Sequence, residues 1–264
     1  MRNTFETLLI SEPRPHVRLV MMNRPEAANA FNTQMARDIT DVFENLGLDD
    51  EGVRCVILTG AGERAFCAGG DLKERNGMTD EAWGRQHLVF ERMIRAVLDC
   101  PVPVVAAVNG AAYAGGCEVA CACDFIYAAE SARFAQTETR IGIIPGAGGT
   151  QTLARAIGER RAKEVILASK PFDAHQAMRW GLVNAIHRGT ELLEQTLAVA
   201  VQIAANAPIA VRQAKQSIHR GGQMSLRDGL AFEIEAYNRT VPTEDRREGV
   251  LAFNEKRAPD FEGR

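Results

Sequence analysis

The chain of 264 residues contains 46% hydrophobic and 25% charged residues and has a formal net charge of -3, a balance typical of a globular protein. A net negative charge gives no bulk attraction for nucleic acid or anionic membranes, and apolar runs such as 102–108 fall far short of the ~20 residues of a membrane helix. The first ten residues lack the basic and apolar regions of a secretion signal, so we expect a cytoplasmic protein.

Six cysteines lie at positions 55, 67, 100, 117, 121 and 123. The spacing of Cys117 and Cys121 would place both on one face of a helix. A zinc site needs nearby histidines or a repeated Cys-x-x-Cys pair, and the sequence has neither beside this cluster. We therefore expect small buried thiols in a reducing compartment and no metal site.

Two strands and a helix are expected first. Residues 5–10 and 16–22 predict strands joined by a turn that contains proline. Pro25 then keeps the stretch NRPEAANAF extended or turning. A helix at about 33–46 follows, with apolar residues on one face and a solvated, acidic to neutral surface on the other.

Strands, loops and helices alternate through the centre of the chain. Residues 53–59 form an apolar, β-branched run typical of a buried strand, and the loop GAGERAFCAGGDLKE follows at once. Further elements are expected as a helix at 79–98, a strand within CPVPVVAAVNG, a helix at 114–121 and a strand at 124–129. This order predicts an α/β fold of βα or ββα units around a parallel sheet, with functional sites at the carboxyl ends of the strands.

From about residue 150 the pattern becomes helical. Helices are expected at 150–157, 159–168, 173–180, 191–206, 208–219, 225–240 and 243–256. No low-complexity linker interrupts the sequence. We therefore expect a core at residues 1–190 and a helical region at 191–264.

Two glycine-rich loops, 67–71 and 110–116, follow two of the buried strands. Neither fits a dinucleotide fingerprint or a P-loop, and a glycine-rich turn alone is more often a tight corner, as is PGAGG at 145–149 before a helix. Two such loops that face one another could have a catalytic function, because each can present one backbone N–H to a carbonyl oxygen that becomes negative during a reaction. A helix starting near Gly115 would add its dipole.

Glu118 and Glu138 are unusual because they stand among apolar and small residues. One interpretation is structural, an ion pair with an arginine such as Arg133 or Arg140. The other is chemical, because burial beside an apolar pocket raises the pKa of a carboxyl group and lets it exchange a proton near neutrality. A nucleophilic triad is not indicated, since the five histidines are scattered and no Gly-x-Ser-x-Gly is present.

Several long stretches, in order, resemble the crotonase (enoyl-CoA hydratase/isomerase) superfamily over nearly the whole chain. They are NRPEAANAF, AFCAGGDLKE, PVPVVAAVNGAAYAGGCEVACACD, IGIIPGAGGTQ and TEDRREGVLAFNEKR. The resemblance implies a crotonase-like spiral of ββα units with a C-terminal helical trimerisation region. It also implies a homotrimer or a dimer of trimers.

The resemblance implies an acyl-CoA substrate whose thioester carbonyl sits between the backbone N–H groups of Gly70 and Gly115. It makes Glu138 the proton donor to C2, and Glu118 the residue that orients and deprotonates water for C3. No metal or redox cofactor is implied, because CoA is part of the substrate. Ala114 departs from the pattern, since many relatives have a third glycine there; it precedes Gly115, so we expect the oxyanion site to be kept.

Further positions match residues that bind CoA in the family. The resemblance places Ala68, Gly70, Asp71, Leu72 and Lys73 along the CoA path, Arg24 and Ala28 near the nucleotide, and Phe253 and Lys256 at the adenine site of a neighbouring subunit.

The implied activity is reversible hydration of 2-enoyl-CoA to 3-hydroxyacyl-CoA, in fatty-acid or amino-acid degradation. Related isomerases usually keep only the position of Glu138, so two glutamates favour a hydratase. An enoyl-CoA isomerase, a branched-chain (methylglutaconyl-type) hydratase and a CoA-binding protein with little catalysis stay open. A related hydratase binds RNA and has a lysine-rich first helix. The helix expected here at 33–46 is not rich in lysine, so no nucleic-acid partner is expected. The acyl preference stays open, because the sequence does not show whether Trp83, Met78 and Tyr113 line the acyl pocket or only pack in the core.

Overall fold

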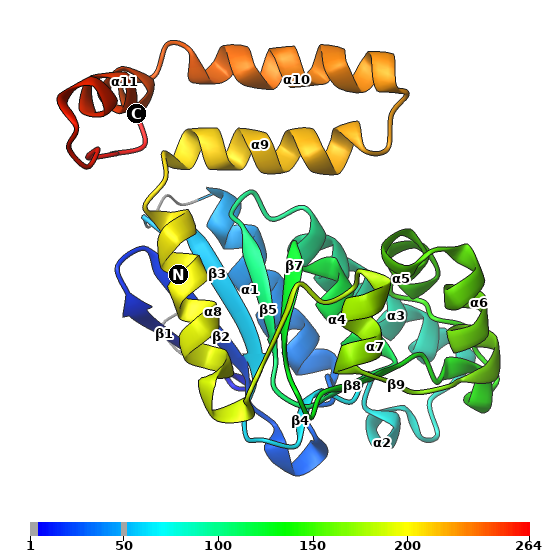
Figure 1. Cartoon of the computed structure of the whole chain (residues 1–264). Helices are drawn as coiled ribbons and strands as arrows, with labels where there is room; N and C mark the ends of the chain where they lie inside the picture. Colours follow the sequence, from blue (N-terminus) through cyan, green and yellow to red (C-terminus); the bar gives the residue numbers. More distant parts are fainter. Residues whose placement is uncertain (1–4, 49–51) are drawn as a thin grey trace.

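The structure is a computed structural model that describes residues 5–48 and 52–264, and in this part of the chain the strands form two sheets (Figure 1). The larger sheet has the order β1-β2-β3-β5-β7-β10, antiparallel between β1 and β2 and parallel elsewhere. Its strands are β1 (Leu8–Arg14), β2 (Val17–Met22), β3 (Cys55–Gly60), β5 (Val104–Val108), β7 (Phe125–Ala129) and β10 (Ala185–His187). The strand expected at 5–10 is therefore shifted toward the carboxyl end of the chain. Residues 1–4 lie outside the described residues. They are the first part of the N-terminal stretch in which the sequence showed no secretion signal.

A smaller sheet completes each repeat and has the order β4-β6-β8-β9. Its strands are β4 (Ala65–Cys67), β6 (Ala111–Tyr113), β8 (Arg133–Ala135) and β9 (Phe172–Asp173). Strands of two or three residues are too short for a periodic pattern, so neither they nor β10 were predicted from the sequence.

Helices follow the strand pairs and complete the spiral. They are α1 (Thr33–Leu48), α2 (Leu72–Arg75), α3 (Asp80–Leu98), α4 (Gly115–Ala122), α5 (Gly149–Ile157), α6 (Glu159–Ala168), α7 (Ala174–Trp180) and α8 (Gly189–Ala204), with short 3-10 helices η1 (Pro25–Ala27) and η2 (Glu138–Ile141). The pairs β3 and β4, β5 and β6, and β7 and β8 each give one strand to each sheet and lead on to α3, α4 and α5. This repeat confirms the expected crotonase-like ββα architecture.

The core is apolar because the central strands are buried on both faces. Every residue of β3 and β5 is buried, which is why these strands read as continuous apolar runs. The helix α8 contacts β2, β3, β5, β7 and β10, while α1 and α3 pack against one another. Among the described residues, no helix is long and apolar enough to cross a membrane.

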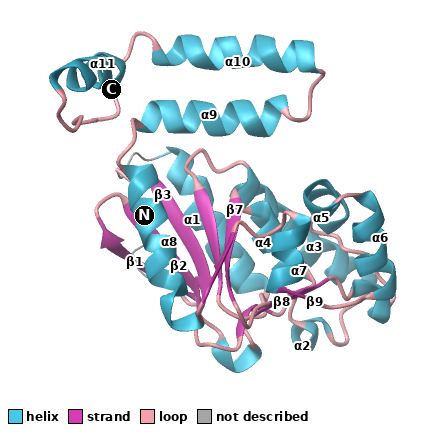
Figure 2. Cartoon of the chain, viewed as in Figure 1, coloured by secondary structure: helices cyan, strands magenta, loops and turns pink. Residues whose placement is uncertain are grey.

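Three further helices, α9 (Pro208–Gly221), α10 (Leu226–Thr240) and α11 (Glu244–Glu255), extend from the core as an arm (Figure 1). Helices α9 and α10 lie side by side, and Figure 2 shows that the strands lie in the core below this arm. Large apolar side chains on the arm are exposed, among them Ile218, Leu226 and Phe253. The domain boundary at 190 stays a prediction.

Candidate active site

A cavity of about 890 Å³ brings together the four residues that the sequence predicted to be catalytic, Gly70, Gly115, Glu118 and Glu138. They come together because β4, β6 and β8 are parallel neighbours in the smaller sheet. Gly70, Gly115 and Glu138 each follow the carboxyl end of one of these strands. Glu118 lies one turn further along α4.

The two glycine-rich loops touch. A side chain at Gly69 would place its Cβ 3.1 Å from the backbone nitrogen of Gly115 and 3.0 Å from the Cβ of Ala114. Gly69 also has φ +97°, a conformation that glycine adopts without strain. Among the described residues, no acceptor takes the backbone N–H of Gly70 or of Gly115. Both amides are thus available as donors to a bound molecule.

Gly115 has no room for a side chain. A Cβ there would lie 2.4 Å from Cζ of Phe31, whose ring makes an edge contact with Phe90 at 4.8 Å. The preceding residue, Ala114, has φ 50° and ψ -125° and accepts the N–H groups of Cys117 and Glu118. Ala114, which precedes the predicted oxyanion residue Gly115, therefore has a backbone conformation that favours glycine.

Glu118 is 3% exposed and lies in the first turn of α4. Its Oε1 accepts hydrogen bonds from the backbone N–H of Ala147 at 2.8 Å and of Gly149 at 2.7 Å. Burial raises the pKa of Glu118, and these two amides oppose the rise. Among the described residues, Glu118 forms no ion pair with Arg133 or Arg140. Backbone amides hold the carboxylate, and Arg140 donates to the carbonyl oxygen of Ser169 at 2.9 Å.

Glu138 is 6% exposed and begins η2. Burial raises its pKa to about 7, with a further increase from the charge of Glu118, while the backbone N–H groups of Thr137 and Glu138 oppose the shift. The side-chain amide of Gln136, oriented to satisfy both of its ends, donates to the two carboxylate oxygens at 2.9 and 3.1 Å. The two acids therefore have different surroundings in one cavity.

Two contributors to the site were not predicted from the sequence. One is Gln136, which is fully buried behind Glu138. The other is the loop 145–149, which was interpreted as a helix-entry turn but supplies both amides that hold Glu118. The glycines of this loop are the feature of the sequence that could have indicated its role. Glycine is needed at position 149 because a Cβ there would lie 3.0 Å from Oε1 of Glu118.

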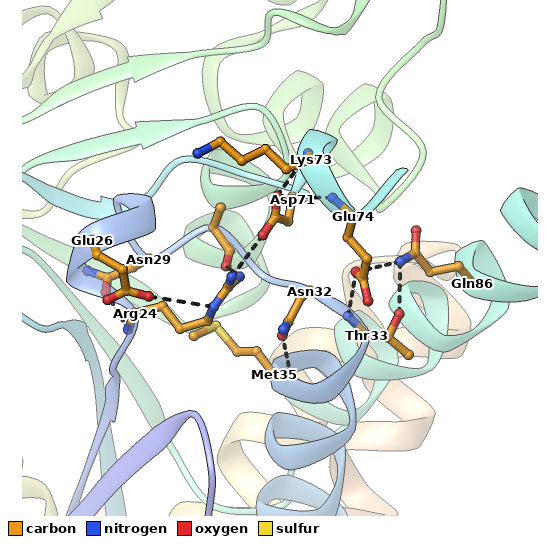
Figure 3. Close-up of polar contacts among 11 residues, drawn as sticks. Arg24, Glu26, Asn29, Asn32, Thr33, Met35, Asp71, Lys73, Glu74 and Gln86 are labelled. Carbon is orange, nitrogen blue, oxygen red and sulfur yellow. Dashed lines mark hydrogen bonds and ion pairs between the residues drawn. The ribbon is translucent and has the colours of Figure 1, made fainter. Parts of the chain in front are cut away.

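The predicted CoA residues divide into two groups. Ala68, Gly70 and Leu72 line the cavity. Asp71 instead accepts the N–H groups of Lys73 and Glu74 at the start of α2 and pairs with Arg24 at 2.9 Å (Figure 3).

The Arg24 guanidinium is also bound inside the fold. It donates to the carbonyl oxygen of Ala30 at 2.6 Å, while the carbonyl oxygen of Ala28 accepts from Ala68 at 3.0 Å. In this chain Arg24 and Ala28 thus join the 24–31 segment to the first glycine-rich loop. Their contact with a nucleotide stays a prediction.

Phe253 and Lys256 lie at the end of the arm and do not line the cavity of their own chain. Phe253 is 83% exposed, and Lys256 ends α11 with φ 56°. Their predicted role at a neighbouring subunit stays a prediction.

The sequence matches the family model for enoyl-CoA hydratase/isomerase over residues 13–264. The chain belongs to this family, within the crotonase superfamily. Its fold agrees with the crystal structure of the enoyl-CoA hydratase from Bacillus anthracis with a TM-score of 0.96, at 42% identity and covering 98% of this chain and 100% of that one.

Curated members of the enoyl-CoA hydratase/isomerase family match across nearly the same span. The short-chain-enoyl-CoA hydratase of Clostridium acetobutylicum is 41% identical over 94% of this chain and 95% of its own length. The mitochondrial enoyl-CoA hydratase of Pongo abelii is 39% identical over 93% of this chain and 83% of its own length. These similarities support a crotonase-family enzyme.

Proposed function

We propose that this family member hydrates 2-enoyl-CoA thioesters to 3-hydroxyacyl-CoA and catalyses the reverse dehydration. The observation that supports this activity is the pairing of two buried carboxyl groups, Glu118 and Glu138, with two unused backbone N–H groups in one cavity. The names of the relatives agree with it.

The proposed reaction begins with the thioester oxygen between the N–H groups of Gly70 and Gly115. Glu118 removes a proton from water as the water oxygen bonds to C3, and the electrons of the double bond move onto the thioester oxygen. Its negative charge is stabilised by the two amides, and the loss of one such donor typically costs ~3–4 kcal/mol. The carbonyl re-forms as Glu138 gives a proton to C2.

The environments of the two acids suit these roles. A carboxyl group with a pKa of about 7, that of Glu138, is protonated in a large fraction of molecules near neutrality and can donate a proton. Glu118 accepts two backbone hydrogen bonds, which favour its ionised form and fix the direction of Oε1. Exchange with solvent returns both groups to their starting states.

Assembly is a second part of the proposal. Large exposed apolar side chains on the arm, including Ile218, Leu226 and Phe253, support a homotrimer or a dimer of trimers. In such an assembly we place Phe253 and Lys256 beside the CoA of a neighbouring subunit. Light scattering of the purified protein tests the oligomer, and a monomer at micromolar concentration would contradict it.

Purified protein incubated with crotonyl-CoA tests the reaction, followed as loss of the absorbance of the conjugated thioester. We expect hydration in the wild type and a loss of ~10²–10⁴-fold in kcat for Glu118→Gln and for Glu138→Gln. Unchanged activity in both variants would contradict the mechanism. A faster conversion of a 3-enoyl-CoA to its 2-enoyl isomer would favour an isomerase instead.

A further inference from the structure

Arg75 is a buried cation in the wall of the same cavity. Its side chain leaves α2 and the residue is 8% exposed. The guanidinium carbon lies 4.0 Å from the centre of the Trp83 ring and 4.8 Å from that of Phe90. Arg75, Trp83 and Phe90 all line the cavity.

Within the part of the chain that the structure describes, only one edge of this guanidinium has a hydrogen-bond partner. Nε donates to Oε1 of Gln86 at 2.7 Å. Among residues 5–48 and 52–264, no hydrogen bond or ion pair engages either terminal amino group of Arg75. These groups carry four of the five N–H donors of an arginine, in a planar fork that fits a carboxylate.

Glu74, the acid next to Arg75 in the sequence, is hydrogen-bonded to other groups. Oε2 of Glu74 accepts the backbone N–H of Thr33 at 2.9 Å and the amide of Gln86 at 2.7 Å (Figure 3). Gln86 thereby connects Arg75 to the start of α1 and fixes the orientation of the guanidinium. Burial lowers the pKa of Arg75, and Glu74 offsets this only in part through its charge.

Burying the charge of Arg75 is costly, and the charge of Glu74 and the stacking on two rings offset only part of that cost. The position of Arg75 gives the charge a use. Phe90 packs beside Gly70, since a Cβ there would lie 3.5 Å from the Phe90 ring, and Arg75 lies over the same ring. A short acyl chain with its carbonyl at Gly70 can therefore extend along Phe90 toward Arg75.

We propose that Arg75 is a specificity-determining residue that binds a carboxylate at the far end of the acyl chain, so that the preferred substrates are 2-enoyl-CoA thioesters of dicarboxylic acids. This inference rests on the proposed function and names the substrate class of the same site. Without a cation, a second carboxylate would be repelled by the ionised Glu118 and would lose its hydration on entry. With Arg75 it gains a charge-assisted, bidentate partner.

The test compares two thioesters of equal length, the mono-CoA thioester of (E)-pent-2-enedioic acid and (E)-pent-2-enoyl-CoA. We expect the wild type to have the higher kcat/KM with the acidic substrate. In Arg75→Met the ratio of the two kcat/KM values should fall by ~10²-fold, because one partner of a desolvated charge pair is lost. Arg75→Lys should lower the ratio less, since it keeps the charge but not the planar fork.

Arg85→Met is the matched control, because Arg85 is an exposed arginine of α3 that pairs with Glu81 at 3.0 Å. It should leave the ratio unchanged. A wild type that prefers the apolar thioester, or an equal loss on both substrates in Arg75→Met, overturns the proposal. The wild-type ratio decides the matter even where the Met variant does not fold.

Binding separates this proposal from the proposed reaction. Calorimetry with the saturated mono-CoA thioester of pentanedioic acid and with pentanoyl-CoA needs no turnover. Tighter binding of the acidic thioester, lost in Arg75→Met, supports the role of Arg75 even if neither unsaturated thioester is hydrated. Hydration of pent-2-enoyl-CoA with no preference for the acidic ligand keeps the reaction and rejects the role of Arg75.

Discussion

The backbone N–H of Gly149 donates to Oε1 of Glu118 at 2.7 Å, and this contact leaves no space for a side chain at position 149. A Cβ there would lie 3.0 Å from Oε1 of Glu118 and 2.8 Å from the side-chain amide group of Gln136. Gly149 therefore holds the carboxylate of Glu118 and leaves room for the side chain of Gln136. Gly149 acts through its backbone N–H and through the absence of a side chain, which lets its backbone lie close to Glu118.

Gly149→Ala should lower kcat for crotonyl-CoA hydration by ~10–100-fold, because a displacement of about 1 Å in a catalytic group has an effect of this size. Steady-state kinetics on the folded variant measures the loss. Gly189→Ala is the control, since Gly189 also begins a helix and a Cβ there meets nothing within 4 Å. Equal activity in the two variants would show that the contact does not set the position of Glu118.

Gly70 and Gly115, the two glycines proposed to stabilise the oxyanion, should differ in their tolerance of alanine. A Cβ at Gly70 would lie 3.5 Å from Phe90 and 3.7 Å from Phe31, which is ordinary contact, whereas at Gly115 it would lie 2.4 Å from Phe31. We expect Gly70→Ala to keep kcat within a few-fold and Gly115→Ala to lose ~10²-fold or more as its amide is displaced. The reverse order would contradict this arrangement of the site.

The pH dependence of kcat/KM should be bell-shaped. Activity should fall as the pH rises through about 7, because Glu138 loses the proton that it donates. It should also fall at low pH, at a value above the 4.5 of an ordinary glutamate, because burial raises the pKa of Glu118 and the base must be ionised. Residual activity of Glu138→Gln should lack the alkaline limb; an unchanged limb would assign it to another group.

Glu138→Gln should stabilise the protein at pH 8. The folded-state pKa of about 7 lies above the ordinary 4.5, so the contribution of Glu138 to stability is full below 4.5 and is lost as the pH rises through 7. After allowance for solvent screening, removing this penalty should add ~1–2 kcal/mol to the free energy of unfolding, or a few degrees in Tm. Thermal unfolding at pH 5 and pH 8 measures it, and the gain should be smaller at pH 5.

Ala114→Gly should also stabilise the fold. Ala114 has φ 50° and ψ -125°, a region that glycine occupies without strain. Relief of that strain exceeds the extra backbone entropy of glycine in the unfolded chain, so we expect a gain of ~1 kcal/mol in the free energy of unfolding by urea denaturation. Ala68→Gly serves as the comparison, since Ala68 is not among the residues with positive φ.

The candidate catalytic residues could be proposed from the sequence because their positions follow local rules. Buried strands show continuous apolar residues, glycine-rich loops follow where the backbone turns sharply, and an acid such as Glu118 among apolar neighbours is unusual by itself. The short strands β4, β6, β8 and β9 were not predictable, since two or three residues hold no period. They are also the strands that bring the loops together.

The sequence by itself determined the α/β class, the buried strands, the two glycine-rich loops and the acidic residues of the site, because each depends on a residue and its near neighbours. Only the tertiary structure decided that Glu118 is held by the amides of the 147–149 loop and not by an arginine. It also decided that Arg75 contacts the rings of Trp83 and Phe90 while its two terminal amino groups have no hydrogen-bond partner among the described residues. The physical reason is that burial and hydrogen bonding depend on which segments the sheet brings together. The spacing of residues along the chain does not show which distant segments will be neighbours.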